Sequence, residues 1–166
     1  IIGENLCKMY REKYKKSIYV VRPAHTFGPG QDFNDKRFLP QILKRAILEN
    51  KIYIYDKGKS VRTWGYIANI IIMLLNIVQY GKSFIYNVSG NNHKSFYEVA
   101  KSVSKSFNNM PIKIRSKNLK YTNNKKTILK ITSKKYFKEF KHKRLINFNE
   151  GIKKLISWNL EWQKLN

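Results

Sequence analysis

The sequence has 166 residues, 42% of them hydrophobic and 14% aromatic, which is enough to build a buried core and excludes a chain that is disordered throughout. Its single cysteine, Cys7, excludes an internal disulfide and is interpreted as a small buried apolar residue. The longest apolar run, over 67–78, is interrupted by asparagines and is short for a bilayer span, and no signal segment opens the chain. We therefore predict a cytoplasmic protein with no membrane partner.

The formal net charge of +24 brings in a second class of function. A basic surface attracts nucleic acid by releasing counterions, so a non-catalytic basic protein that binds nucleic acid or other polyanions is the alternative. Residues 101–166 hold 18 Lys and Arg against 3 acids, whereas residues 1–100 hold 16 against 7. Most of the excess is lysine, accompanied by asparagine and isoleucine as in A/T-rich coding sequences, and no nucleic-acid-binding module is recognisable. Nucleic acid is therefore not the favoured partner.

A helix and a strand open the chain. Apolar residues at helical spacing predict an amphipathic helix over 2–16 whose apolar face packs on a sheet. That face consists of Leu6, Met9, Tyr10 and Tyr14. The β-branched and aromatic run over 18–22 predicts a buried strand, which Pro23 ends before Gly28-Pro29-Gly30 forces a loop. Ligands of open α/β sheets bind at the carboxyl ends of strands, so we expect the site here.

The next segment is predicted to form a helix and a hairpin. Apolar residues recur with a 3.6-residue period over 38–50, which indicates a helix. Alternation over 52–55 predicts a short strand, and the turn over 56–59 directs the chain toward 61–64, so we expect a β-hairpin.

The rest of the chain continues to alternate between helices and strands. Ser95 is predicted to cap a helix, with Glu98 completing a capping box. A lysine- and asparagine-rich stretch up to Thr127 is predicted to be a loop. The helices are predicted over 66–79, 95–107, 131–140 and 150–158, and the strands over 84–88 and 112–114. The whole pattern predicts an α/β fold.

Five segments resemble motifs of the extended short-chain dehydrogenase/reductase family, in that family's order and spacing. They are Glu4-Asn5-Leu6-Cys7, Arg22-Pro23-Ala24-His25-Thr26-Phe27-Gly28-Pro29-Gly30, Asn34-Asp35-Lys36-Arg37, Asp56-Lys57-Gly58-Lys59-Ser60-Val61-Arg62 and Tyr86-Asn87-Val88. The chain is most similar to NAD-dependent nucleotide-sugar epimerases, 4,6-dehydratases and UDP-glucuronate decarboxylases, from residue 1 to about Trp158. The resemblance implies the end of a Rossmann-type domain over 1–30 and a smaller, nucleotide-sugar-binding lobe mainly over 31–166.

The resemblance also implies what this chain lacks. The family's catalytic Tyr-x-x-x-Lys would end just before Ile1, and its glycine-rich dinucleotide loop does not occur in the sequence. We therefore expect a C-terminal portion that holds no catalytic residue and is inactive alone. NAD or NADP would bind only in the full-length enzyme, the missing N-terminal Rossmann part would be a partner, and a homodimer is left open. A truncated gene, a split gene and a partial sequence are equally open.

The resemblance assigns cofactor and substrate roles to residues that follow the first strand. Pro23 would line the cofactor site by its shape, and Thr26 would touch the nicotinamide side of NAD. His25 stands where relatives usually place an asparagine that binds substrate. It is either a substrate contact or a buried structural histidine, and the sequence does not decide between the two.

Two arginines are the strongest candidates for binding a nucleotide sugar, either a UDP- or a dTDP-sugar. A guanidinium grips diphosphate oxygens in a bidentate manner, and Arg37 and Arg62 both match family positions. Arg62 also follows a glycine turn and lies close in sequence to Trp64 and Tyr66, which suit a base-and-ribose pocket. Tyr55 either flanks the uracil or thymine ring or is an ordinary strand residue.

Other polar positions are given no site. His93 and His142 have no acidic or cysteine neighbours at ligand spacing, so no metal is expected. Acids that the family usually carries are replaced at Asn69 and around 130–132, which we interpret as relaxed constraint.

Overall fold

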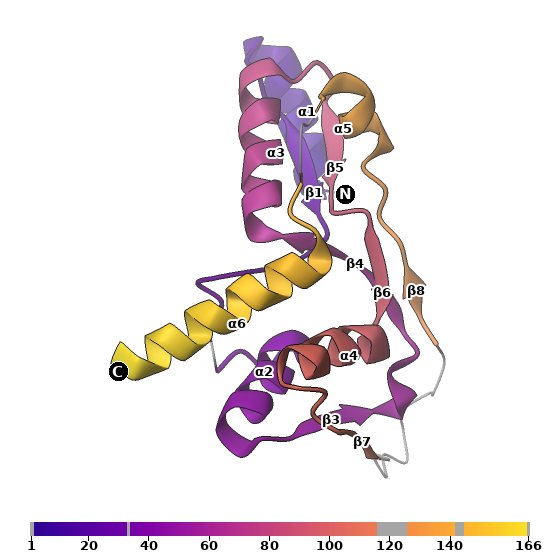
Figure 1. Cartoon of the computed structure of the whole chain (residues 1–166). Coiled ribbons are helices and arrows are strands. Elements are labelled where there is room, and N and C mark those ends of the chain that lie inside the picture. Colours follow the sequence, from indigo (N-terminus) through magenta and orange to yellow (C-terminus); the bar gives the residue numbers. More distant parts are fainter. Residues whose placement is uncertain (1, 33, 116–125, 142–144, 166) are drawn as a thin grey trace.

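Three small sheets follow one another along the long axis of the molecule (Figure 1). The computed structural model describes residues 2–32, 34–115, 126–141 and 145–165. The first sheet contains β1 (Val20–Pro23) and β5 (Ile85–Val88), the second β2 (His25–Phe27), β4 (Val61–Tyr66), β6 (Asn92–Ser95) and β8 (Ile128–Leu129), and the third β3 (Ile52–Tyr55) and β7 (Ile112–Arg115). Helices alternate with these strands, which confirms the predicted α/β class.

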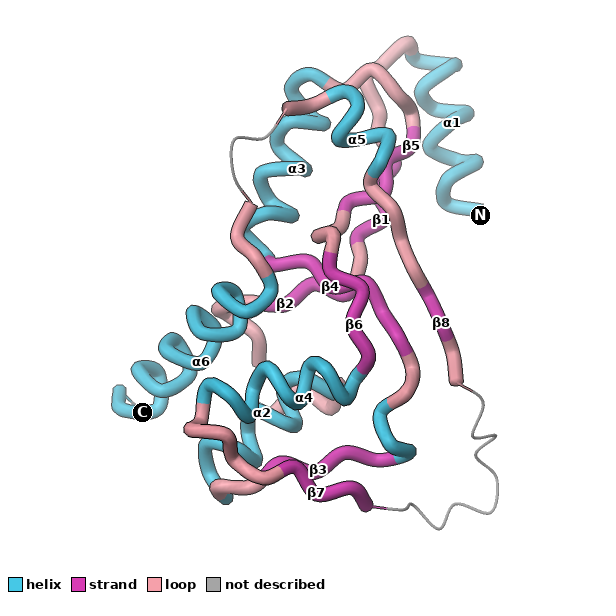
Figure 2. The backbone as a smooth tube through the Cα atoms, turned by 45° about the vertical axis from the view of Figure 1, so that its right-hand side comes forward, coloured by secondary structure: helices cyan, strands magenta, loops and turns pink. Residues whose placement is uncertain are grey.

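The helices of the described chain cover different sheets. They are α1 (Ile2–Tyr14), α2 (Phe38–Glu49), α3 (Ile67–Tyr80), α4 (Phe96–Ser106), α5 (Lys134–Glu139) and α6 (Phe148–Leu165). Figures 1 and 2 show α1, α3 and α5 around the first sheet, and α2 with α4 beside the third. Helix α6 contacts β4 and α4, so it lies across the middle of the molecule.

Within the described residues, parallel pairing predominates. Strands β1 and β5, β2 and β4, β3 and β7, and β4 and β8 pair in parallel, and only β4 with β6 pairs antiparallel. Parallel neighbours need a long crossover, and helices supply the crossovers here. The predicted hairpin is therefore wrong: a short 3-10 turn, η1 (Asp56–Gly58), follows β3, and β4 enters a different sheet.

Two apolar clusters hold the elements together. The larger joins α2, β3, β4, α4 and α6 through fully buried side chains such as Ile42, Ile54 and Leu155. The smaller joins α3, β5 and α5 through Met73, Tyr86 and Tyr136. Burying one such side chain contributes roughly 1.5–3 kcal/mol, so these clusters supply the main stabilising term.

Local chemistry explains where several helices begin and end. The Ser95 side chain accepts from the backbone N–H of Glu98, and the Glu98 carboxylate accepts from the backbone N–H of Ser95, so the predicted capping box is confirmed. Helix α2 ends at Asn50, which has the left-handed φ of 52°. Helix α3 ends at Gly81, as predicted. Helix α5 is shorter than predicted and α6 is longer.

The predicted apolar face of α1 does not pack on a sheet. Leu6, Met9, Tyr10 and Tyr14 are each at least half exposed. Cys7 is only partly buried, so its interpretation as a buried residue is also wrong. Helix α1 is attached mainly by polar contacts, such as the two hydrogen bonds that Arg22 donates to the Glu4 carboxylate. None of the helices in the described ranges is long and apolar enough to span a bilayer.

Candidate functional site

The chain passes from the first sheet to the second at Ala24. Pro23 is the last residue of β1, the backbone N–H of Ala24 donates to the Val88 carbonyl at 2.9 Å, and His25 already belongs to β2. The segment after Pro23 was expected to leave the sheet as a loop, but it continues as a strand because β4 offers it a parallel partner. Thr26 lies one residue further on, and its hydroxyl donates to the Ala24 carbonyl.

His25 is exposed at this junction, so the interpretation of a buried structural histidine is wrong. Its ring centroid lies 5.4 Å from that of Trp64, its partner in the parallel pair. Partial desolvation, followed by the positive charges of Arg62 and Arg37, lowers the pKa of His25 below 6.5. The imidazole is therefore mainly neutral at pH 7, and it can both donate and accept a hydrogen bond.

Arg62 is half-buried on β4 and is held by the segment that precedes β8. Its Nη1 donates to the carbonyls of Val61 and Thr127, and its Nη2 donates to the Thr127 hydroxyl at 2.8 Å. Its guanidinium carbon lies 5.6 Å from the ring centroid of Phe96. The aromatic ring beneath Arg62 is thus Phe96, whereas Trp64 is buried among core rings.

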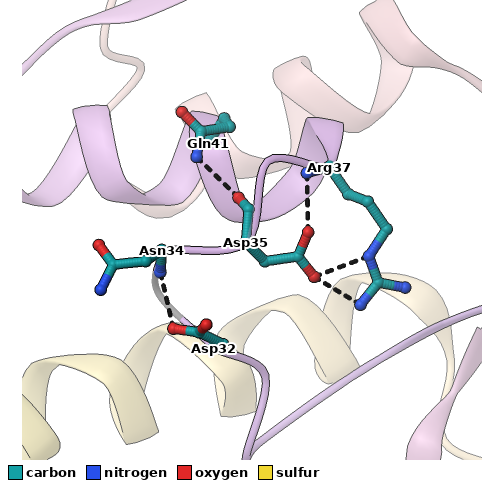
Figure 3. A network of polar contacts seen from close by, with 5 residues as sticks. All are labelled: Asp32, Asn34, Asp35, Arg37 and Gln41. Carbon is teal, nitrogen blue, oxygen red and sulfur yellow. Dashed lines mark hydrogen bonds and ion pairs between the residues drawn. The ribbon is translucent and has the colours of Figure 1, made fainter.

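Arg37 reaches the same place from α2. It immediately precedes Phe38, whose ring centroid lies 4.4 Å from that of Phe96. The Phe38–Phe96 pair therefore separates the chain at Arg37 from Arg62. Arg37 is itself hydrogen-bonded to Asp35, in a network that Figure 3 shows from close by.

Three of the six nominated residues are thus brought together, namely His25, Arg37 and Arg62. Pro23 and Thr26 lie at the adjoining strand junction. The backbone of Tyr55 ends β3, but its side chain lies outside the described part of the chain.

Sequence reasoning missed three partners of these residues: Asp35, Phe96 and Thr127. Asp35 left a signal, because an Asp two residues before an arginine that opens a helix is typical of an Asx-turn. Phe96 was interpreted only as an inward-facing helix residue. Thr127 left none, since its contact with Arg62 depends on tertiary structure.

Metal-binding groups are absent from the part of the chain that the structure describes. The His93 ring nitrogen Nδ1 lies 2.8 Å from the Thr63 hydroxyl, which gives that histidine a structural contact. His142 lies outside the described residues.

The positions interpreted as relaxed constraint make specific contacts. The side-chain amide of buried Asn69 donates to the Ile146 carbonyl at 2.8 Å and accepts from the Ile146 N–H at 3.1 Å. A carboxylate could accept but not donate, so the amide fits this site better than the acid it replaces. The backbone N–H of Ile131 likewise donates to the buried Thr63 hydroxyl. The structure thus gives both positions a constraint.

A sequence model described as the NAD dependent epimerase/dehydratase family matches residues 1–89, which is more than half of the chain. The chain belongs to this family. The resemblance to extended short-chain dehydrogenases/reductases is thereby confirmed.

Individual relatives agree with this assignment of the epimerase/dehydratase chain. A dTDP-4-dehydro-6-deoxy-D-allose reductase of a Streptomyces species is 30% identical over 100 residues, covering 59% of this chain and 31% of the relative. The dTDP-glucose 4,6-dehydratase of Salmonella typhimurium is 25% identical over 169 residues, covering 96% of this chain and 46% of the relative. The chain therefore spans less than half the length of these curated relatives.

Solved structures share the fold of the epimerase/dehydratase chain. A UDP-N-acetylglucosamine 4-epimerase from Methanobrevibacter ruminantium matches with a TM-score of 0.81 at 18% identity, covering 96% of this chain and 51% of that one. The dTDP-glucose 4,6-dehydratase of Bacillus anthracis, in complex with NAD, matches with a TM-score of 0.80 at 20% identity, covering 97% and 50%. The expected fold is therefore confirmed, over about half of each neighbour.

Proposed function

We propose that this chain is the nucleotide-sugar-binding part of an NAD-dependent nucleotide-sugar epimerase, dehydratase or decarboxylase. The observation that carries the proposal is the meeting of Arg37, Arg62 and His25 around the Phe38–Phe96 pair. Membership of the epimerase/dehydratase family supports the same class of reaction.

The chemistry of these residues suits a UDP- or dTDP-sugar. Two guanidiniums can share the oxygens of one diphosphate, and each such charge-assisted hydrogen bond is stronger than a neutral one. Neutral His25 can hydrogen-bond a sugar hydroxyl without adding a third charge. Tyr55 stays a candidate for the base, as the sequence suggested.

The reacting groups and the cofactor belong to the longer enzyme in this proposal. NAD, when bound, supplies the hydride acceptor, and Pro23 and Thr26 would line its site, with the Rossmann-type part ending near residue 30. The chain alone should not form NADH from UDP- or dTDP-sugars. A measured turnover would refute this division of labour. Cytoplasmic location stays a prediction.

The rest of the longer enzyme would also cover exposed apolar surface. Besides the α1 face, α3 exposes Ile71, Ile72, Leu75 and Val78. Apolar patches of this kind usually mark an interface, and an N-terminal Rossmann part or a second copy would bury them. We therefore expect the isolated chain to aggregate, which light scattering during purification would measure. A monomer that melts cooperatively would contradict this expectation.

The central experiment measures UDP binding by calorimetry, for the wild-type chain and for Arg62→Ala. We expect the substitution to cost about 1.5–3 kcal/mol of binding free energy, the range for a hydrogen bond to a charged group. Lys16→Ala removes a positive charge from an exposed loop before β1 and should leave UDP affinity unchanged. UDP binding that is absent, or indifferent to Arg62, would end the proposal.

Two further arms identify other causes. Thr127→Val removes the hydroxyl that Arg62 contacts but keeps the guanidinium, so it should weaken UDP binding less than Arg62→Ala does. An equal loss would mean that Arg62 acts only by holding the β8 segment. Short RNA tests the nucleic-acid alternative: its affinity would fall log-linearly with salt and depend on the lysines of 113–144 together rather than on Arg62.

A further inference from the structure

The contact between Asp35 and Arg37 is asymmetric. The Asp35 side chain is 17% exposed, whereas that of Arg37 is 67% exposed. The carboxylate accepts the backbone N–H of Arg37 through Oδ1 at 2.8 Å and the side-chain Nε–H through Oδ2 at 2.7 Å, while Nη2 lies against the same Oδ2. One residue thus fixes both the backbone and the side chain of its neighbour, as the dashed lines in Figure 3 show.

Asp35 is itself held in place on its backbone side. The Gln41 side chain, one turn into α2, donates to the Asp35 carbonyl at 2.7 Å. Preceding it, the Asn34 backbone N–H donates to the Asp32 carboxylate at 2.8 Å, which forms a second turn of the same kind. The carboxylate is therefore a fixed support, tied to α2 and to the loop before it (Figure 3).

The hydrogen bonds leave one edge of the guanidinium for another ligand. A guanidinium has five N–H donors in a planar fork, and Asp35 uses donors on Nε and Nη2 only. The positive charge of Arg37 is felt at His25, so the free edge belongs to the region where Arg62 also lies. A long side chain loses rotamer freedom when it binds, and prior immobilisation reduces that cost.

We propose that Asp35 is a positioning residue, which holds the Arg37 guanidinium ready for the diphosphate of the nucleotide. The inference rests on the proposed function, since it names the support of one of the two diphosphate-binding arginines. Asp35 does not touch the ligand; it acts through Arg37.

Asp35→Asn tests the inference, because asparagine keeps one acceptor oxygen but not the carboxylate that holds the fork. Asp32→Asn is the matched control: it removes the same charge from the same loop, and its remaining oxygen can still accept the Asn34 N–H. Removing an acid near a polyanion site should by itself leave UDP affinity unchanged or raise it. We expect Asp35→Asn instead to weaken UDP binding by about two- to fivefold, the size of an ordered surface ion pair.

The readouts are UDP affinity by calorimetry and uridine affinity by NMR titration. Asp35→Asn should leave uridine binding unchanged, because uridine has no phosphate, and it should cause no further loss in an Arg37→Ala background. Equal affinities for the Asp35→Asn and Asp32→Asn variants, a loss of uridine binding, or an undiminished effect without Arg37 would overturn the inference.

The failures are distinguishable. If Arg37→Ala weakens UDP binding and Asp35→Asn does not, the positioning role is wrong and the proposed function stands. If Arg37→Ala has no effect while Arg62→Ala does, Arg37 is not a ligand and the inference falls with it. If the wild-type chain does not bind UDP, both fall.

Discussion

Replacing Asn69 by aspartate restores the residue type that the family usually carries, yet it should destabilise this chain. Asn69 is 3% exposed and makes two hydrogen bonds to the backbone of Ile146. Asn69→Asp loses the donated bond, worth roughly 0.5–1.5 kcal/mol, and turns a carboxylate oxygen toward a buried carbonyl, which costs about 1–3 kcal/mol more. The expected loss at pH 7 is therefore about 2–4 kcal/mol.

The same substitution should make stability depend on pH. Burial against a carbonyl raises the pKa of the new carboxyl in the folded state above its unfolded value. A protonated carboxyl can donate to the Ile146 carbonyl, so the folded variant regains stability below the unfolded pKa and loses it as the pH rises through the folded pKa. The deficit relative to wild type should be smaller at pH 4 than at pH 7.

Urea denaturation at both pH values, followed by circular dichroism, measures this effect. Asn91→Asp makes the same chemical change at an exposed position and should stay within about 0.5 kcal/mol of wild type at either pH. The reasoning is refuted if Asn69→Asp is as stable as wild type at pH 7, or if its deficit is the same at pH 4.

Three further predictions use the same denaturation assay. Gly58→Ala should cost at least about 1 kcal/mol, because φ is +59° and a Cβ would lie 2.7 Å from the Tyr97 nitrogen; an unchanged midpoint would contradict it. Ser95→Ala should cost about 1 kcal/mol, and the difference from wild type should shrink as the pH falls through the folded pKa of Glu98, which the Ser95 hydrogen bonds lower; a constant difference would count against it. Tyr86→Phe should cost roughly 1–3 kcal/mol, since its buried hydroxyl bridges two backbone N–H groups and a carboxylate on α5; a neutral result would mean that water replaces it.

Elements with a strong local signal could be predicted from the sequence. Helix α4 has its capping box, α3 has a glycine at its end, and the apolar period of α2 runs to Asn50. Strand β6 could not be found, because its Asn-His-Lys-Ser sequence has no apolar alternation and its extended shape depends on pairing with β4.

The candidate site was predictable in its residue types but not in its supports. Arg37 and Arg62 could be nominated because guanidiniums suit phosphates. Their contacts with Asp35 and Thr127 required the structure, and the second of these joins residues 65 positions apart. The exposure of the α1 face was missed because helical periodicity indicates an apolar face, not what covers it.

The predominance of parallel pairs has a consequence for how the chain folds. Val20 pairs with Ile85, and Val61 pairs with Ile128, so neither contact can form through a local turn. Closing a loop of about 65 residues costs about 2.4 kcal/mol more entropy than a four-residue turn, at about 0.6 kcal/mol per doubling. Such non-local contacts slow folding. At a synthesis rate of about 5–20 residues per second, β1 waits roughly 3–13 s before β5 is made, and throughout that interval its unpaired edge is open to pairing with the wrong strand.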